Sequence, residues 1–315
     1  MCNSIGFHHI SVMPEETLSK LLHDPRGIYV DCTLGGGGHA GRLLERLAPE
    51  GRLIGIDQDA TAIAHVRQTL GHDGRVTLVQ SNFANISEIL RERDINKVQG
   101  ILFDLGVSSP QLDEAERGFS YTHDGVLDMR MNQGSEVSAA DILNSADVKE
   151  LTRIFREYGE ERWSARIAHF IDKRRRQSPI TTTGELVEII KAAIPAAARR
   201  QGPHPAKRIF QALRIQVNRE LDVFAAALDQ ALECLGAQGR LAVITFHSLE
   251  EKILTDKIRT WLGRCTCPPG FPECRCGACQ RVEVVTRKPV LPSAAEIQGN
   301  PRARSAKLRV VQRSE

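Results

Sequence analysis

The sequence predicts an α/β fold in which a Rossmann-like sheet is interrupted by a block of helices. Three observations support this prediction: apolar runs alternate with helical spacing up to residue 105, a glycine-rich turn follows the first run, and the alternation stops between residues 113 and 213. Alternating strands and helices form parallel sheets with right-handed crossovers. At 315 residues, the chain also exceeds the size at which one core usually stops growing, so we expect a second domain or a large insertion.

The first strand and the turn after it organise the chain. Residues 28–30 form an apolar run, four glycines follow at 35–38, and helical spacing begins at Ala40. Glycine permits the unusual backbone angles of such a turn and lets a ligand approach the main chain closely. This strand, turn and helix therefore indicate a nucleotide-like ligand.

The second strand, 52–56, leads into Asp57. An acid at this place holds ribose hydroxyls in nucleotide-binding folds. The pattern Gly36-x-Gly38-x-x-Gly41 also matches the dinucleotide fingerprint, which is a weak signal by itself. The ligand could thus be a dinucleotide or a different compound that contains a nucleoside.

The remaining elements follow from periodicity, beginning with a helix that opens at Pro14. In the sheet we expect helices at 60–70, 86–93, 216–235 and 249–262, and strands at 76–80, 100–105, 239–246, 282–287 and 307–312. Between them, helices are expected at 139–144, 148–158, 162–176, 183–193 and 206–213. The predicted domains are a discontinuous sheet domain, 1–112 and 214–315, and a helical insertion domain, 113–213.

The end of the fourth strand is the second informative place. Ligands of open parallel sheets bind at the carboxyl ends of strands, near the switch in strand order. Asp104 lies there, followed by Ser109, Pro110 and Gln111. Because a residue before proline favours extended geometry, we expect the Ser109 carbonyl to point into the cleft. The alternative is a plain loop with a turn proline.

Composition excludes several classes of protein. Hydrophobic content of 41% with 26% charged residues is ordinary for a soluble globular chain, and no apolar run is long enough to span a membrane. The first nine residues show no secretory signal, so we expect a cytoplasmic protein whose eight cysteines are not in disulfides. A net charge of +3 alone says little about nucleic acid.

Taken together, these motifs resemble the MraW-type family, S-adenosylmethionine-dependent methyltransferases that act on the exocyclic N4 of a cytosine in bacterial small-subunit ribosomal RNA. The resemblance implies a class I methyltransferase sheet, S-adenosylmethionine as cofactor and ribosomal RNA, presented in the assembled small subunit, as substrate. Whether two copies form a homodimer stays open. The matching stretches are 9–15, 31–41, 55–57, 104–113, 116–120, 127–131, 158–162, 210–214, 246–250 and 300–305.

The resemblance also implies the site residues. Main-chain approach at the glycines suits the aminoacyl end of the cofactor, Asp57 can accept from ribose hydroxyls, and Phe83 can stack on adenine. Asp104 can accept from the cofactor's ammonium or from the target amine, and His39 could instead only cap its helix. The implied cofactor-binding residues are Gly37, Gly38, His39, Asp57, Phe83, Asp104 and Gln111, and the catalytic residues are Asp104, Ser109 and Pro110.

Enzymes that methylate exocyclic amines generally carry an Asp/Asn/Ser-Pro-Pro-aromatic stretch after strand four, and residues 109–111 resemble a degenerate version. The aromatic residue is missing, so Phe119 and Tyr121 are candidates for stacking on the base. The chain has no Pro-Cys dipeptide, which argues against a cysteine nucleophile attacking a ring carbon.

Basic clusters could contact RNA phosphates, although solvated helix faces are the plain alternative. They are 173–176, Arg199-Arg200, Lys207-Arg208 and Arg302, Arg304, Lys307 and Arg309, and they make the insertion the expected RNA-docking element. A cysteine-rich loop could bind structural zinc, but its C-x-C spacing is irregular and we assign no metal ligand. Its members are Cys265, Cys267, Cys274, Cys276 and Cys279.

Two other functions remain open at this stage. The dinucleotide fingerprint would suit an NAD-dependent oxidoreductase, although no acid/base pair for hydride transfer is evident. A non-catalytic ribosome assembly factor that kept the fold would also have this sequence pattern.

Overall fold

The computed structural model describes residues 11–200, 204–264, 267, 273, 275 and 279–314. The chain separates into two compact units. The first comprises Met1–Gly106 and Leu221–Glu315, and the second comprises Val107–Glu220. None of the helices in the described parts combines the length and apolarity needed to cross a bilayer.

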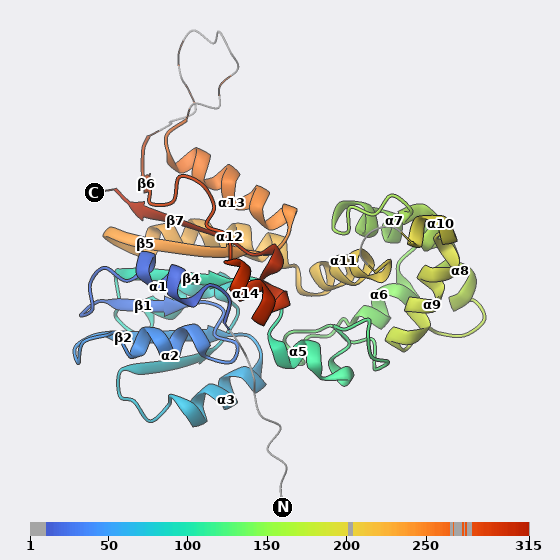
Figure 1. Ribbon diagram of the computed structural model, residues 1–315, viewed down its shortest axis with the longest axis horizontal. Coiled ribbons are helices and arrows are strands. Elements are labelled where there is room, and N and C mark those ends of the chain that lie inside the picture. The colour runs from blue at the N-terminus through green and yellow to red at the C-terminus, as the bar shows by residue number, and fades with distance from the viewer. Residues whose placement is uncertain are drawn as a thin grey trace, which may run out of the picture. The chain divides into compact units, whose positions relative to one another are not determined.

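The first unit is built on one sheet, whose order among the described residues is β3-β2-β1-β4-β5-β7-β6 (Figure 1). Strands β1 to β5 run parallel, while β7 lies antiparallel between β5 and β6. The dinucleotide-binding order 3-2-1-4-5-6 has no such reversed strand. The strands are β1 (Ile28–Asp31), β2 (Arg52–Asp57), β3 (Val76–Gln80), β4 (Val98–Asp104), β5 (Leu235–Thr245), β6 (Val282–Val284) and β7 (Lys307–Arg313).

Helices pack on both faces of this sheet because successive strand residues point to opposite faces. Val30 and Phe103 belong to a core shared with α4, α12 and α13, whereas Tyr29 and Leu102 belong to a core shared with α1, α2 and α3. The predicted α/β fold is therefore confirmed. The helices of this sheet are α1 (Pro14–Leu21), α2 (Gly38–Leu44), α3 (Ala60–Thr69), α4 (Ile86–Arg91), α12 (Glu220–Cys234), α13 (Ser248–Trp261) and α14 (Ala294–Gly299).

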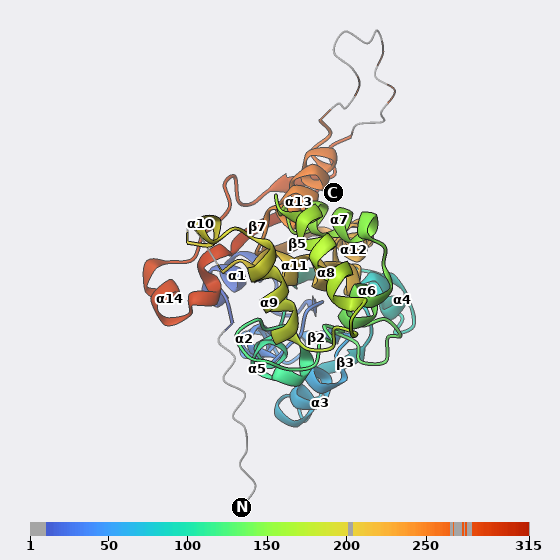
Figure 2. The same ribbon diagram turned by 90° about the vertical axis from the view of Figure 1, so that its right-hand side faces the viewer.

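The second unit is helical (Figure 2). Its core is a single cluster that includes Phe155, Leu186 and Leu213. The helices are α5 (Ser109–Asp113), α6 (Ala139–Ser145), α7 (Val148–Glu157), α8 (Ser164–Arg175), α9 (Thr183–Ala193), α10 (Ala196–Arg199) and α11 (Ala206–Asn218).

One predicted boundary is displaced. The break between the helices expected at 206–213 and 216–235 lies at Arg219, which adopts a left-handed conformation with φ 50° between α11 and α12. The strand expected at 282–287 is also shorter, ending at Val284. By contrast, β3 and α9 occupy the predicted ranges.

Candidate active site

The glycine turn lies between β1 and α2. Gly35 and Gly37 have φ of 50° and 78°, a backbone region that residues other than glycine rarely adopt. A Cβ added at Gly37 would also lie 2.9 Å from Cγ2 of Val66. The backbone conformation therefore favours glycine at both positions, and close packing favours it further at Gly37.

Asp57 ties this turn to the end of β2. Its Oδ2 accepts from the amide of Gly35 at 2.8 Å, and its Oδ1 accepts from the amide of Asp59 at 2.9 Å. Burial raises the pKa of Asp57 to about 6, although these backbone hydrogen bonds act in the opposite direction. The carboxylate thus lies in the turn, held by backbone donors that include Gln58, and it retains acceptor capacity for a ligand.

A second cluster of ionisable residues, which includes Asp31 and Asp104, lies where β1 and β4 end side by side. Asp31 pairs with Leu102 in the sheet register, which brings the carboxyl ends of the two strands together. The backbone amide of Asp104 donates to Oγ1 of Thr33 at 2.6 Å, and the Thr33 amide donates to Oδ1 of Asp31 at 3.1 Å. Nε2 of His39, on α2, lies 3.4 Å from Oδ2 of Asp104.

The pKa values follow from this burial and charge. Burial raises the pKa of Asp31 to about 6, while the neighbouring His39 opposes the rise. For His39, burial acts to lower the pKa, but the contact with Asp104 and the charge of Asp31 outweigh it, so that its pKa is raised. These groups therefore form one coupled electrostatic cluster.

Three buried polar atoms in this cluster have no hydrogen-bond partner among the described residues. They are Oδ1 of Asp104 and both ring nitrogens of His39, whose Nε2 approaches Asp104 as an ion-pair contact without hydrogen-bond geometry. A buried polar atom without a partner costs free energy, and such atoms accumulate where a ligand supplies the missing partner. The cluster therefore fits a ligand that carries hydrogen-bond donors.

Phe83 begins a short 3₁₀ turn, Phe83–Asn85, after β3. Its half-buried ring packs edge-on against Phe103, with centroids 5.3 Å apart and planes at 85°. This contact fixes the ring near the carboxyl ends of the strands. The first unit thus brings together Asp104 and His39 in one cluster and Asp57 with the glycine turn in another.

The other predicted site residues belong to the second unit and form the start of α5. Ser109 is the first helical residue, so the expected extended geometry is wrong: the extended residue is Ser108, the N-cap, with ψ 157°. Proline suits the first turn of a helix, and Gln111 accepts from the Ser108 amide at 3.1 Å. This capping box outweighs the preference that Pro110 imposes on Ser109.

The two candidates for stacking on a base differ in exposure. Phe119 is only 5% exposed and lies in the core of the second unit, so it cannot present a face to a base. Tyr121 stacks on His204, with centroids 4.8 Å apart and planes at 5°. One face of Tyr121 is therefore occupied, while His204 is exposed.

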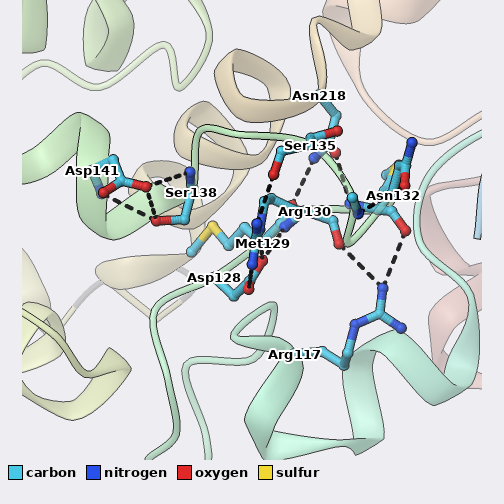
Figure 3. Close-up of polar contacts among 11 residues, drawn as sticks. Arg117, Asp128, Met129, Arg130, Asn132, Ser135, Ser138, Asp141 and Asn218 are labelled. Atoms are coloured by element: carbon cyan, nitrogen blue, oxygen red, sulfur yellow. Dashed lines mark hydrogen bonds and ion pairs between the residues drawn. The ribbon is translucent and has the colours of Figure 1, made fainter.

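The matching stretch 127–131 holds the interior of the second unit together (Figure 3). Arg117 donates to the carbonyls of Arg130 and Met131 at 3.1 and 3.3 Å. Asn218 accepts from the Met131 amide and donates to the Met129 carbonyl, both at 2.8 Å. These bonds hold Met129 at φ 61°, which shows that this stretch organises the fold of the unit.

The basic cluster 173–176 has two kinds of member. Arg175 is mostly buried and donates to the carbonyls of Leu143 and Ala146, so it caps α6. Arg174 pairs with Glu185 at 2.8 Å. Lys173 and Arg176 are exposed, and although Arg176 pairs with Asp172 at 2.8 Å, these two are the members that a partner can reach.

Two of the residues described above were not predicted as site residues. Asp31 could have been found by the argument that selected Asp57 and Asp104, since all three are acids at the carboxyl ends of parallel strands. Thr33 needed the strand register, because its partner Asp104 is distant in sequence. Of the cysteine loop, Cys265, Cys274 and Cys276 lie outside the described residues, and the zinc question stays a prediction.

Sequence comparison finds a family model and named relatives that match nearly the full length of this chain. The family model described as the MraW methylase family matches residues 6–314. A protein of Brevibacillus brevis named ribosomal RNA small subunit methyltransferase H is 54% identical over 311 residues, covering 98% of this chain and 99% of its own. A Symbiobacterium thermophilum protein of the same name is 53% identical over 308 residues, covering 98% and 97%. A solved rRNA methylase from Streptococcus thermophilus aligns over 96% of this chain and 95% of its own with 12% identity and a TM-score of 0.42.

Proposed function

This chain belongs to the MraW methylase family, and from that premise we propose that it transfers a methyl group from S-adenosylmethionine to the exocyclic N4 of a cytosine in small-subunit ribosomal RNA. The single observation that supports the acceptor is Asp104. Its buried Oδ1 has no hydrogen-bond partner among the described residues. Asp104 lies at the carboxyl end of β4, and ligands of parallel sheets bind at the carboxyl ends of the strands. An amino group is a donor that can supply that partner.

The residues of the first unit fit the cofactor. The main chain at Gly37, Gly38 and His39 would approach the aminoacyl part, Asp57 would accept from the ribose hydroxyls, and the ring of Phe83 would lie against adenine. Gln111 in the second unit is a further proposed contact. When bound, S-adenosylmethionine supplies an already electrophilic methyl group, so that no enzyme nucleophile is required.

The protein's task is placement. Asp104 would accept an N–H of the target amine and orient the nitrogen lone pair, which is otherwise delocalised into the ring. Ser109 and Pro110, in the first turn of α5, would contact the base as the remaining catalytic residues. The base must leave its stack to reach such a site.

Phosphate contacts would come from exposed cations of the second unit, among them Lys173, Arg176, Arg199 and Arg200. We further propose that the substrate is the assembled small subunit, that the protein acts in the cytoplasm, and that a homodimer is a state to be tested by solution mass measurement.

The two other functions can be separated from this one. Family membership and the antiparallel β7 go against an NAD-dependent oxidoreductase. A non-catalytic assembly factor would bind small subunits without transferring label. Incubation with labelled S-adenosylmethionine and small subunits from a strain lacking the enzyme is expected to label the RNA, and an unlabelled RNA would overturn the proposal.

A further inference from the structure

Two contacts hold Asp104 from different sides. Its backbone amide donates to Oγ1 of Thr33 at 2.6 Å, which fixes the end of β4 against the residues after β1. Its Oδ2 lies 3.4 Å from Nε2 of His39, an ion-pair contact without hydrogen-bond geometry that draws the two side chains together. Thr33 is itself anchored, because its amide and its hydroxyl lie 3.1 and 3.5 Å from Oδ1 of Asp31.

These contacts leave one atom of Asp104 unused. Oδ2 faces His39, whereas Oδ1 is buried and has no hydrogen-bond partner among the described residues. His39 is the second residue of α2, and its side chain is only 5% exposed. Burial therefore leaves it little freedom to move away from Asp104. The carboxylate is therefore held in one orientation, with one oxygen ready for a donor.

We propose that Thr33 and His39 are positioning residues that fix Asp104, so that its Oδ1 is presented to the exocyclic amine of the target base. The inference rests on the proposed function, because it takes an amine as the methyl acceptor. It assigns His39 a role beyond main-chain contact with the cofactor. It also assigns Thr33, which carries no expected contact with either ligand, to the catalytic geometry.

The surroundings of His39 decide which substitution separates positioning from charge. The charged groups that act on it are Asp104 and Asp31, which favour the imidazolium, and Arg42, which disfavours it. A neutral imidazole with its proton on Nε2 would also donate to Asp104. Glutamine offers an amide donor that does not titrate, whereas leucine offers none.

The test compares pairs of variants in the labelled methyl-transfer assay on small subunits. Thr33→Val keeps the shape of the side chain and removes the hydroxyl, while Thr33→Ser keeps it; His39→Leu and His39→Gln form the second pair. We expect Thr33→Val and His39→Leu to lower kcat about 10- to 100-fold, because small displacements of a catalytic group cost that much. For Thr33→Val, which the account gives no contact with the cofactor, the Kd for S-adenosylmethionine, measured by calorimetry, is expected to stay at the wild-type value.

Thr33→Ser and His39→Gln are expected to recover most of kcat, and His39→Gln to remove one ionisation from the kcat–pH profile. Thr69→Val and His72→Gln, at exposed positions outside the site, are the matched controls and are expected to behave as wild type.

Three results would overturn the inference: unchanged kcat in Thr33→Val and His39→Leu, no recovery in their conservative partners, or a loss explained by a weaker Kd alone. If Thr33→Val does not fold, the His39 pair decides. If neither Thr33→Val nor His39→Leu folds, the two residues are structural and the inference is wrong. Wild-type protein that labels no RNA would instead overturn the proposed function.

Discussion

The amide of Gly35 donates to Oδ2 of Asp57 at 2.8 Å, so the glycine turn and the end of β2 form one structure. The second carboxylate oxygen is fixed by the amide of Asp59. A ribose bound at Asp57 would therefore meet a carboxylate that is oriented before the ligand arrives, which reduces the ordering cost of binding.

Replacement of Asp57 by asparagine is expected to weaken S-adenosylmethionine binding. The new amide nitrogen would face the N–H of Gly35 or of Asp59, because asparagine offers only one acceptor oxygen. The amide nitrogen can no longer accept from a ribose hydroxyl, and loss of one such hydrogen bond in the complex corresponds to about 1–3 kcal/mol, or about 5- to 150-fold in Kd. Calorimetric titration measures it, and Asp94→Asn, at a position with φ 54° that asparagine tolerates, is the control. Equal Kd values for the two variants would remove Asp57 from the binding site.

Asp31 is expected to destabilise the ligand-free protein at neutral pH. Its pKa is raised from 3.8 to about 6 by burial, so between these values the folded state binds more protons than the unfolded chain. Its contribution to stability is therefore present below about pH 4 and is lost as pH rises through 6.

Asp31→Asn should remove that dependence and still accept from the Thr33 amide. We expect its free energy of unfolding to exceed that of the wild type above pH 6, with the difference shrinking towards pH 4. Urea unfolding of both proteins across this range measures it. A difference that grows as the pH falls would show that the sign is wrong.

Arg175 is expected to stabilise the second unit through its bonds to two carbonyls at the end of α6, those of Leu143 in the last turn and of Ala146 at the C-cap. Arg175→Ala should lower the free energy of unfolding by about 1–3 kcal/mol, because buried acceptors are left unpaired. Arg176→Ala, at a neighbouring side chain that is 76% exposed, should change it by less than about 0.5 kcal/mol. Equal effects of the two variants in thermal or urea unfolding would contradict this assignment.

The double variant Lys173→Glu/Arg176→Glu is expected to weaken binding to small subunits and to leave cofactor affinity unchanged. Because each lost phosphate contact removes about one unit from the slope of log K against log salt, the slope should fall by about 2. Filter binding over a salt series measures both quantities.

Its control is Arg26→Glu/Arg52→Glu, at exposed positions near the amino ends of β1 and β2. Ligands are expected at the opposite, carboxyl ends of these strands. Binding that weakens equally in the two double variants would indicate a general charge effect and no docking surface at α8.

Sequence alone predicted most of the sheet because its signals are local. The glycine turn, the acid after β2 and the apolar run of β3 are each readable within ten residues or so, and the structure has them where they were expected. The break between α11 and α12 was expected after residue 213 and lies at Arg219, because neither glycine nor proline marks its position. Likewise, Ser109 was misjudged because the preference before proline was weighed without the cap at Ser108.

The acids at the strand ends could be picked out from the sequence, whereas their contacts could not. Acids at strand ends could be selected from the pattern, but the contacts of Asp104 with Thr33 and His39 depend on register and on where α2 begins. The buried state of Phe119 also depends on the packing of the helical unit, which periodicity does not give.

The most direct test of the account is the fate of a labelled methyl group. Wild-type protein and Asp104→Ala are each incubated with labelled S-adenosylmethionine and small subunits from a strain lacking the enzyme, and the RNA is digested for nucleoside mass analysis. We predict N4-methylcytidine with the wild type and a rate lower by at least about 100-fold with Asp104→Ala, as for loss of a group that orients the reacting atoms. Label in another nucleoside, or equal rates for the two proteins, would contradict it.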